Sequence, residues 1–169
     1  SEMCIRDRIN TANQFNTNLS LVKSVVKSND KRKILLTKKL ENILNNKLKN
    51  KVITFLGVTF KPNTDDMREA SSIPMIKYLN KNNSKIRYHD PSGEKNEFKK
   101  LKNVKYYKDI SSACFNCDLI VLHTEWNDFR LLNFKKLVKK RNFKIFDMRN
   151  MYSPSKMKNL KIKYFGIGR

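Results

Sequence analysis

Glycine, cysteine and long apolar runs are scarce in this chain of 169 residues, and each shortage excludes a class of protein. Its four glycines do not form the GxGxxG turn with which many α/β sheets hold a dinucleotide. Its three cysteines, Cys4, Cys114 and Cys117, are too few for a disulfide framework. The single CxxC pair has no second pair and no histidines at ligand spacing, so we expect no metal site and interpret Cys117 as a small buried hydrophobic residue. No apolar run approaches the length of a membrane span and no export leader is recognisable, which predicts a cytoplasmic protein.

Negative charge is also scarce, because 15 Asp and Glu residues accompany 37 Lys and Arg residues and leave a net charge of +22. Such an excess fits either a protein that binds nucleic acid or a membrane surface, or a solvated lysine-rich surface. The lysines are scattered through every segment, and aromatic residues do not alternate with them as a stacking platform requires. We therefore favour the solvated surface, with no membrane partner and with nucleic acid as the less favoured partner. Part of the charge would suit a cleft for a pyrophosphate-bearing ligand.

Hydrophobic periodicity predicts an α/β fold with a doubly wound, mostly parallel, Rossmann-like sheet preceded by linker helices. Residues 1–8 share no pattern with the rest, and we set them aside as a cloning or assembly scar. Residues 9–50 have helical spacing, with a break at 28–30 that we interpret as a cap or a bend. From Lys51 onward, strand candidates alternate with helical segments. The strands are expected at Val52–Leu56, Lys85–His89, Val104–Tyr107, Asp118–Leu122, Phe143–Phe146 and Ile162–Phe165. Helical or mixed segments are expected between them, near Ile73–Leu79, Glu94–Leu101, Ile110–Cys114 and Leu131–Lys139.

The segment VITFLGVTFKPNTDDMRE, residues 52–69, places a charged loop directly after a strand. Open α/β sheets bind their ligands at the carboxyl ends of strands, and loops between rigid elements often carry function. Without a glycine-rich turn, an anionic ligand must be bound by side chains, and the candidates are Lys61 as a compact charge and Arg68 as a bidentate fork. Surface ion pairing is the alternative for both cations. We interpret Asp65 and Asp66 as structural residues that hold Arg68, rather than as a general acid and base.

A helix should follow this loop, because Ser71 and Ser72 can cap it and Pro74 is tolerated in a first turn. His89 and Asp90 end the second predicted strand. An acid at that position binds the ribose in a dinucleotide fold, but the glycine fingerprint is missing, so we favour a turn-forming Asp-Pro and a structural histidine.

The segment Thr124-Glu125-Trp126 follows the fourth predicted strand. We expect Trp126 and Phe129 to pack a helix start over the sheet edge, with Thr124 or Asn127 as its cap. The alternative is that this loop forms a wall of the ligand crevice.

Four motifs occur in order along the chain: GVTFKPNTDDMRE (57–69), HTEWNDF (123–129), DMRN (147–150) and YFGIGR (164–169). Together they resemble the C-terminal landmarks of the UDP-glucose 6-dehydrogenase family, and the resemblance runs from about residue 9 to the last residue. It implies a helical linker and dimerisation segment over residues 9–50 and a UDP-sugar-binding C-terminal domain over residues 51–169. A homodimer through the linker helices is implied in the same way.

The resemblance also implies roles for three cations. The family residues that match Lys61 and Arg149 bind the UDP-sugar substrate. The family residue that matches Arg68 reaches the cofactor NAD, which is held mainly by another domain. For Arg149, a structural pair with Asp147 is the alternative.

The reaction implied by the resemblance oxidises UDP-glucose to UDP-glucuronate with two NAD and a covalent intermediate on a cysteine. In the family this cysteine lies in a Ser-Cys-Phe-Pro-Lys-Asp context just before the segment that resembles residues 9–16. The context of Cys4 does not match, and the NAD-binding domain is also missing from the sequence. We therefore expect a C-terminal piece of such an enzyme, inactive without its NAD-binding partner domain. The alternatives are a sister dehydrogenase for UDP-N-acetylmannosamine or GDP-mannose, and a stand-alone basic module that binds nucleic acid.

Overall fold

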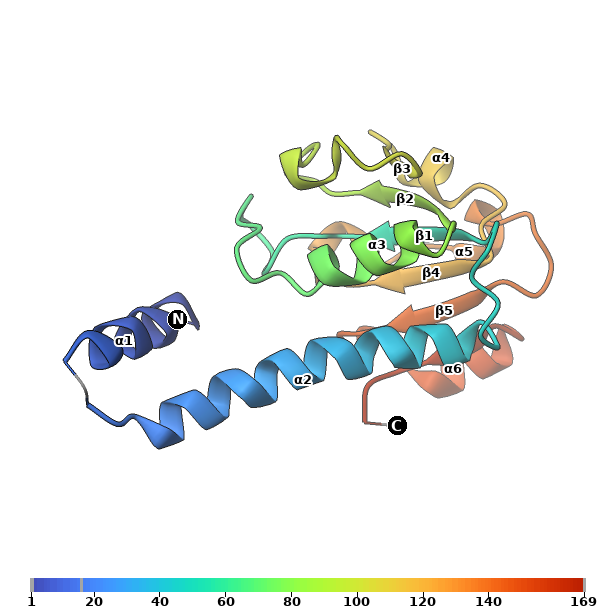
Figure 1. Cartoon of the computed structure of the whole chain (residues 1–169). Coiled ribbons are helices and arrows are strands. Elements are labelled where there is room, and N and C mark those ends of the chain that lie inside the picture. Colours follow the sequence, from blue (N-terminus) through green and yellow to red (C-terminus); the bar gives the residue numbers. More distant parts are fainter. Residues whose placement is uncertain (1, 16, 169) are drawn as a thin grey trace.

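Six parallel strands form one sheet at the centre of the computed structural model, which describes residues 2–15 and 17–168, without the side chains of residues 2–6 and 13 (Figure 1). The strand order is β3-β2-β1-β4-β5-β6, and every neighbouring pair is parallel. The chain therefore winds outward from β1 in one direction and from β4 in the other, which confirms the predicted doubly wound sheet. The strands are β1 Val52–Leu56, β2 Lys85–His89, β3 Val104–Tyr106, β4 Leu119–Leu122, β5 Lys144–Asp147 and β6 Lys163–Phe165.

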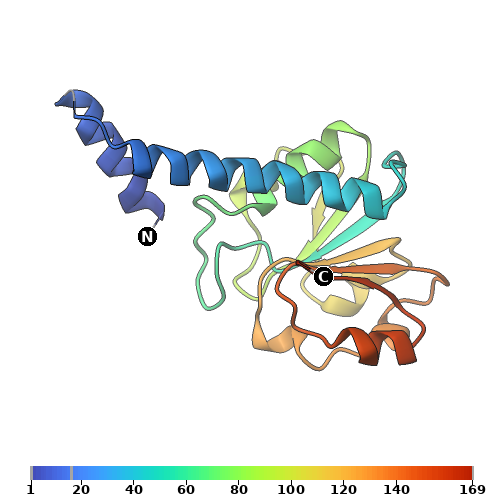
Figure 2. The same cartoon turned by 90° about the horizontal axis from the view of Figure 1, so that it is seen from below.

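Helices cover both faces of this sheet, as Figure 2 shows from below. On one face lie α2 (Ser20–Ile43) and α3 (Ser72–Lys81), and on the other lie α4 (Ile110–Cys114), α5 (Phe134–Leu137) and α6 (Pro154–Asn159). Helix α1 (Glu2–Gln14) packs against the part of α2 that projects beyond the sheet. Two 3-10 turns, η1 (Asn96–Phe98) and η2 (Asn127–Phe129), complete the structure. None of the helices in the described ranges has the length and apolar character needed to span a bilayer.

The alternation of side chains along β1 explains why both faces are covered. Ile53 and Phe55 are fully buried against α2 and α3, while Leu56 is fully buried in the cluster that includes α4 and α5. Strand β4 lies between β1 and β5, and it is buried on both faces because its four apolar residues pack alternately into the two clusters that the helices cover. A run of consecutive buried apolar residues is typical of a central parallel strand.

The strand predictions are confirmed to within a residue or two, but one helix prediction is wrong. Helix α2 continues through residues 28–30 without a break, so no cap or bend occurs there. The helical or mixed segment expected near 94–101 contains the short turn η1. The backbone of residues 2–8 belongs to α1, so no structural boundary coincides with residue 9, and the division of the chain into 1–8, 9–50 and 51–169 stays a prediction.

The exit from β1 is held in one conformation by two residues. Gly57 has a φ of +76°, and a Cβ atom there would lie 2.6 Å from the Cβ of Thr124, so any side chain would be strained and would clash. The buried carboxylate of Asp90 accepts the backbone N–H groups of Val58 at 2.7 Å and Thr59 at 3.3 Å. Its other oxygen accepts the N–H two residues further on, which confirms the predicted turn-forming role of Asp90.

Candidate functional site

A pocket of about 370 Å³ lies at the carboxyl ends of β1, β4 and β5, beside α2. Its lining comprises Asn29, Arg32, Lys33 and Leu36 from α2, Phe60, Lys61, Glu69 and Ser71 between β1 and α3, His123 and Glu125 after β4, and Met148 and Arg149 after β5. Four of these side chains are basic and two are acidic, so the pocket has an excess of positive charge. It lies where the winding direction of the sheet reverses, which is the usual ligand position in this architecture.

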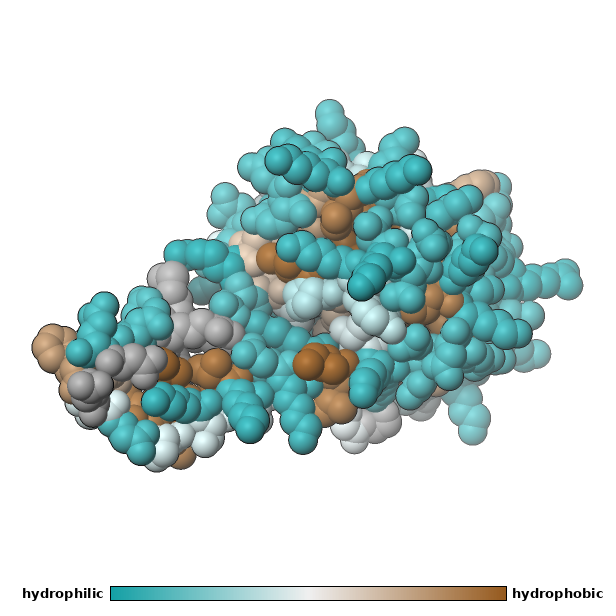
Figure 3. Space-filling model, viewed as in Figure 1, coloured by the Kyte–Doolittle hydropathy of each residue, from teal (hydrophilic) through white to brown (hydrophobic). Residues whose placement is uncertain are grey.

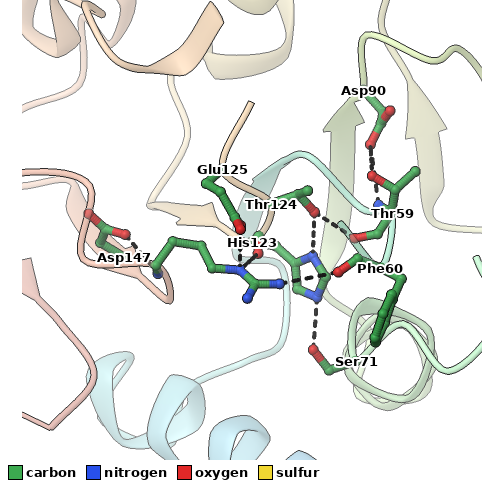
Figure 4. A network of polar contacts seen from close by, with 9 residues as sticks. Thr59, Phe60, Ser71, Asp90, His123, Thr124, Glu125 and Asp147 are labelled. Carbon is green, nitrogen blue, oxygen red and sulfur yellow. Dashed lines mark hydrogen bonds and ion pairs between the residues drawn. The ribbon is translucent and has the colours of Figure 1, made fainter. Parts of the chain in front are cut away.

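Lys61 and Arg149 line this pocket together, although they belong to loops far apart in the sequence. Arg149 donates through Nε to the carbonyl oxygen of His123 at 2.8 Å and through Nη2 to that of Phe60 at 3.4 Å (Figure 4). Phe60 directly precedes Lys61, so Arg149 holds the loop that carries Lys61. The two predicted substrate-binding residues are thus neighbours in space, and their roles stay a prediction.

Glu125 forms an ion pair with Arg149 but accepts no hydrogen bond from it. Its Oε2 lies 2.9 Å from Nε of Arg149, but that N–H is directed at the carbonyl oxygen of His123. Oε2 is buried, and within the described part of the chain no donor forms a hydrogen bond with it. A hydroxyl group of a ligand in the pocket could supply the missing donor.

A chain of hydrogen bonds through the imidazole of His123 connects the walls of the pocket (Figure 4). The hydroxyl of Thr124 donates to the carbonyl oxygen of Thr59 at 2.7 Å, so its oxygen must accept from Nδ1–H of His123 at 3.0 Å. Nε2 is then the acceptor for the hydroxyl of Ser71 at 2.8 Å. These bonds fix one neutral tautomer and join the start of α3 to the loops after β1 and β4.

The same environment keeps His123 neutral. Complete burial, with a smaller contribution from the positive charge of Arg149, lowers its pKa from 6.5 to about 3. His123 is therefore a structural acceptor and donor at neutral pH and not a titrating group.

Arg68 lies outside the lining of the pocket. It forms a fork with Asp66, with Nε 3.0 Å from Oδ1 and Nη2 2.9 Å from Oδ2, which confirms the expectation that Asp66 holds it. The hydrogen bonds from Arg68 lower the pKa of Asp66, and the charge of Lys61 adds a smaller effect. The side chain of Arg68 is 66% exposed, and its predicted contact with NAD stays a prediction.

Helix α2 contributes pocket residues that sequence reasoning did not identify. Asn29, Arg32 and Lys33 are spaced so that they share one face of the helix, and Lys33 forms a 2.6 Å ion pair with Glu69. Its partner lies 36 residues away, so no local pattern could reveal the pair. The only signal was the basic run Lys31-Arg32-Lys33, which by itself is typical of a solvated helix.

Several expected structural contacts are replaced by contacts within the site. Ser71 stands at the N-cap position of α3 but makes no capping bond, because its hydroxyl bonds to His123, and the hydroxyl of Ser72 donates to the carbonyl of Val58 at 2.5 Å. At η2 no side-chain cap is formed, so the expected capping by Thr124 or Asn127 is wrong. The loop after β4 does form a wall of the pocket, as the alternative interpretation held.

The alternative of a structural Asp147–Arg149 pair is realised through the backbone of Arg149 and not through its guanidinium. Asp147 accepts the backbone N–H of Arg149 at 3.0 Å and bonds through its other oxygen to Tyr152 and Tyr164. The guanidinium of Arg149 is directed to the carbonyl groups of the pocket wall instead.

The first turn after β1 does not fit the pyrophosphate of NAD. The open side of Gly57 faces Thr124 at a distance that leaves no room even for a methyl group. Backbone N–H groups of Val58 and Thr59, which could otherwise approach phosphate, are occupied by Asp90. The turn after β1 therefore offers no free backbone N–H groups to a phosphate, and an anion at this edge of the sheet would have to be met by side chains.

The two cysteines of the CxxC pair are packing residues. Cys114 and Cys117 are buried and not joined by a disulfide, and burial raises the pKa of both thiols, that of Cys117 to about 12. The expected role of Cys117 as a small hydrophobic residue is confirmed. The side chain of Cys4 lies outside the described residues.

The strand order and the position of the pocket define a doubly wound, Rossmann-like class of α/β domain. Residues 54–154 match a family model described as the UDP-glucose/GDP-mannose dehydrogenase family, UDP binding domain. The chain therefore belongs to the UDP-glucose/GDP-mannose dehydrogenase family, as the four motifs predicted.

Curated relatives agree with this assignment. The chain is 33% identical over 162 residues to a UDP-glucose 6-dehydrogenase of Rickettsia felis, covering 94% of this chain and 36% of the relative. It is 33% identical over 164 residues to a UDP-glucose 6-dehydrogenase of Rhizobium meliloti, covering 95% of this chain and 37% of that relative. The chain thus spans little more than a third of the length of these relatives, and it corresponds to their C-terminal portion.

Solved structures share the fold at low sequence identity. A UDP-glucose dehydrogenase of Pyrobaculum islandicum superposes with a TM-score of 0.73 at 22% identity, over 94% of this chain and 34% of that one. A UDP-D-ManNAc dehydrogenase of Pyrococcus horikoshii superposes with a TM-score of 0.71 at 20% identity, over 94% of this chain and 36% of that one. Since enzymes for different sugars share the architecture, the fold alone does not select a substrate.

Proposed function

We propose that the pocket beside α2 binds the diphosphate of a UDP-sugar, with Lys61 and Arg149 as its principal ligands. The observation that carries this proposal is that both cations, from distant loops, line one pocket at the carboxyl ends of the central strands. Arg32, from α2, is a third cation in the lining. In the described part of the chain, neither Lys61 nor Arg32 has a carboxylate within ion-pair distance, whereas Lys33 and Arg149 each face one.

Charge and geometry both favour a diphosphate in this position. Charge-assisted hydrogen bonds to phosphate are roughly twice as strong as neutral ones, and an arginine can bind two oxygens at once. The buried Oε2 of Glu125, which accepts no hydrogen bond within the described part of the chain, would accept one from a hydroxyl of the sugar or ribose. A nucleotide sugar supplies both groups, while inorganic phosphate supplies only one.

The wider proposal is an NAD-dependent oxidation of UDP-glucose to UDP-glucuronate, in which this chain's part is to bind the substrate and close the cleft. It is supported by relatives at 33% identity that are named UDP-glucose 6-dehydrogenase. The NAD and the reacting cysteine would belong to a separate domain, whose cofactor Arg68 could reach from its exposed position. The proposal places the chain in the cytoplasm, without turnover on its own.

A homodimer through α2 belongs to the same proposal. Helix α2 exposes Leu21, Val25, Ile34 and Leu35, and Figure 3 shows hydrophobic residues along its course, among further hydrophobic residues on the same face. Exposed apolar patches of this kind often mark protein interfaces.

Calorimetric titration of the chain with UDP tests the proposed site. We expect saturable binding that weakens at least about tenfold in Lys61→Met, because one charge-assisted contact is lost. The matched control is Lys100→Met, an exposed lysine that lies away from the pocket. Equal affinity in both variants would contradict the assignment.

The same variants separate this function from that of a basic nucleic-acid-binding module. Binding of an oligonucleotide that falls steeply with salt and is indifferent to Lys61, together with no binding of UDP, would favour the second function. Comparing UDP-glucose with UDP-N-acetylmannosamine and GDP-mannose in the titration tests the choice among sister substrates.

A further inference from the structure

A second groove, of about 420 Å³, lies between α4 and α5 and shares no lining residue with the first pocket. Its lining comprises Arg87, Tyr107, Ser111, Ser112, Phe115, Lys136, Leu137 and Lys139, and we refer to it as the Arg87 groove. Arg87 lies on β2 between Ile86 and Tyr88, which are buried against α2 and α3. Because side chains alternate along a strand, Arg87 points to the opposite face of the sheet.

The Arg87 groove holds positive charge that the protein does not neutralise. Arg87, Lys136 and Lys139 line it, and in the part of the chain that the structure describes none of them forms an ion pair with a carboxylate. By contrast Lys140, the neighbour of Lys139, lies 2.6 Å from Asp118. An anion would therefore meet three cations in the groove that have no ion-pair partner there.

Aromatic rings stand among these cations. The guanidinium of Arg87 lies 5.6 Å from the ring centre of Tyr107, and the ammonium of Lys105 lies 5.4 Å from it. Lys139 lies 6.0 Å from the ring centre of Phe115, which is 47% exposed. Arg87 is also fixed by a 2.6 Å hydrogen bond from Nη1 to the carbonyl oxygen of Phe115. Aromatic and basic residues do not alternate along the sequence, but folding brings them next to one another in the Arg87 groove.

We propose that the Arg87 groove is a second binding site, which takes a nucleotide. Arg87, Lys136 and Lys139 bind its phosphate, and its planar base stacks on the exposed ring of Phe115. Simple phosphate would leave the ring exposed, and an apolar ligand would leave the charges unmatched, so a ligand with both a phosphate and a ring fits best. A free mononucleotide and a nucleotide of a single-stranded nucleic acid share this chemistry.

The test is a titration of the isotope-labelled chain with AMP, in which binding is monitored through the amide NMR signals of Tyr107, Ser112 and Phe115. These signals report the Arg87 groove separately from the first pocket, so failure here does not bear on the proposed UDP site. The variant is Lys136→Gln/Lys139→Gln, and the matched control is Lys156→Gln/Lys158→Gln on α6, which removes the same charge from an exposed helix.

We expect saturable shifts in the groove, an affinity about tenfold lower in the variant, and a change of less than about twofold in the control. Phe115→Ser should weaken AMP about fivefold or more while leaving the affinity for inorganic phosphate unchanged, because only the stacking contact is lost. Equal weakening in variant and control, or shifts confined to the first pocket, would overturn the proposal. A titration with a short oligothymidylate distinguishes a free nucleotide from a nucleic acid as the ligand. An affinity well above that of AMP, with a steep salt dependence, indicates nucleic acid. An affinity equal to that of AMP indicates a free nucleotide.

Discussion

The neutral, buried His123 should make the stability of the fold depend on pH between 7 and 5. In the native chain its pKa is lowered from 6.5 to about 3, chiefly by burial. In the unfolded chain the imidazole regains its ordinary pKa near 6.5. The unfolded state therefore takes up a proton as pH falls through 6.5, while the native state does not. The stabilisation is fully present above pH 6.5 and is lost progressively toward pH 3.

The magnitude follows from these two pKa values. Between pH 7 and pH 5, proton uptake by the unfolded state lowers the free energy of unfolding by about 2 kcal/mol. Carboxylates contribute little in this window, because they remain ionised in both states above about pH 5. The lowered pKa values of Asp66 and Asp118 place their titration at still lower pH.

Urea unfolding at pH 5, 6 and 7, followed by far-ultraviolet circular dichroism, measures this loss. The variant His123→Gln supplies the reference, since glutamine has a donor and an acceptor but no proton to gain in this range. We expect the wild-type chain to lose about 2 kcal/mol more than the variant between pH 7 and pH 5. Equal pH dependence in the two chains, or a native imidazole that titrates near pH 6.5 by NMR, would refute the reasoning.

Three further predictions concern the structure that holds the site. Gly57→Ala should lower the free energy of unfolding by about 3 kcal/mol in chemical denaturation, because a positive φ and a 2.6 Å contact with Thr124 both oppose a side chain. Asp90→Ala should lower the free energy of unfolding by about 3 kcal/mol in the same measurement and should weaken UDP binding, because it leaves the buried N–H groups of Val58 and Thr59 without an acceptor. Unchanged stability would contradict this prediction. In a Cys4→Ser background, the remaining buried thiols should not react with iodoacetamide at pH 8 until the chain unfolds, because burial raises the pKa of both; rapid labelling of the native chain would contradict this.

The sheet could be predicted from the sequence because its signals are local. Each strand is a short apolar or alternating run that ends in a turn, so β1 and β2 were placed at their observed bounds. The loops at the carboxyl ends of β1, β4 and β5 could be identified for the same reason. Their meeting in one pocket follows from the strand order, because β1, β4 and β5 are neighbours in the sheet.

What could not be predicted depends on contacts between distant segments. The hydroxyl of Ser71 has the local pattern of a helix cap, but His123, 52 residues away, takes its hydrogen bond. Asn29 and Asp30 resemble a helix break, yet α2 continues through them because its buried residues further along pack on the sheet. Local propensity is a weak guide wherever tertiary packing favours another arrangement.

Pocket residues on α2 were missed for a related reason. Arg32 lies in a basic run in a chain that is rich in lysine throughout, so its charge carries no local information. Only the fold shows that α2 passes beside the ends of the strands and turns this side chain to the pocket.

The most direct measurement is a crystal structure of this chain with UDP bound. The account predicts that the two phosphates lie between the ammonium of Lys61 and the guanidinium of Arg149, each within ion-pair distance. A diphosphate bound away from these two side chains, or in contact with neither, would contradict it.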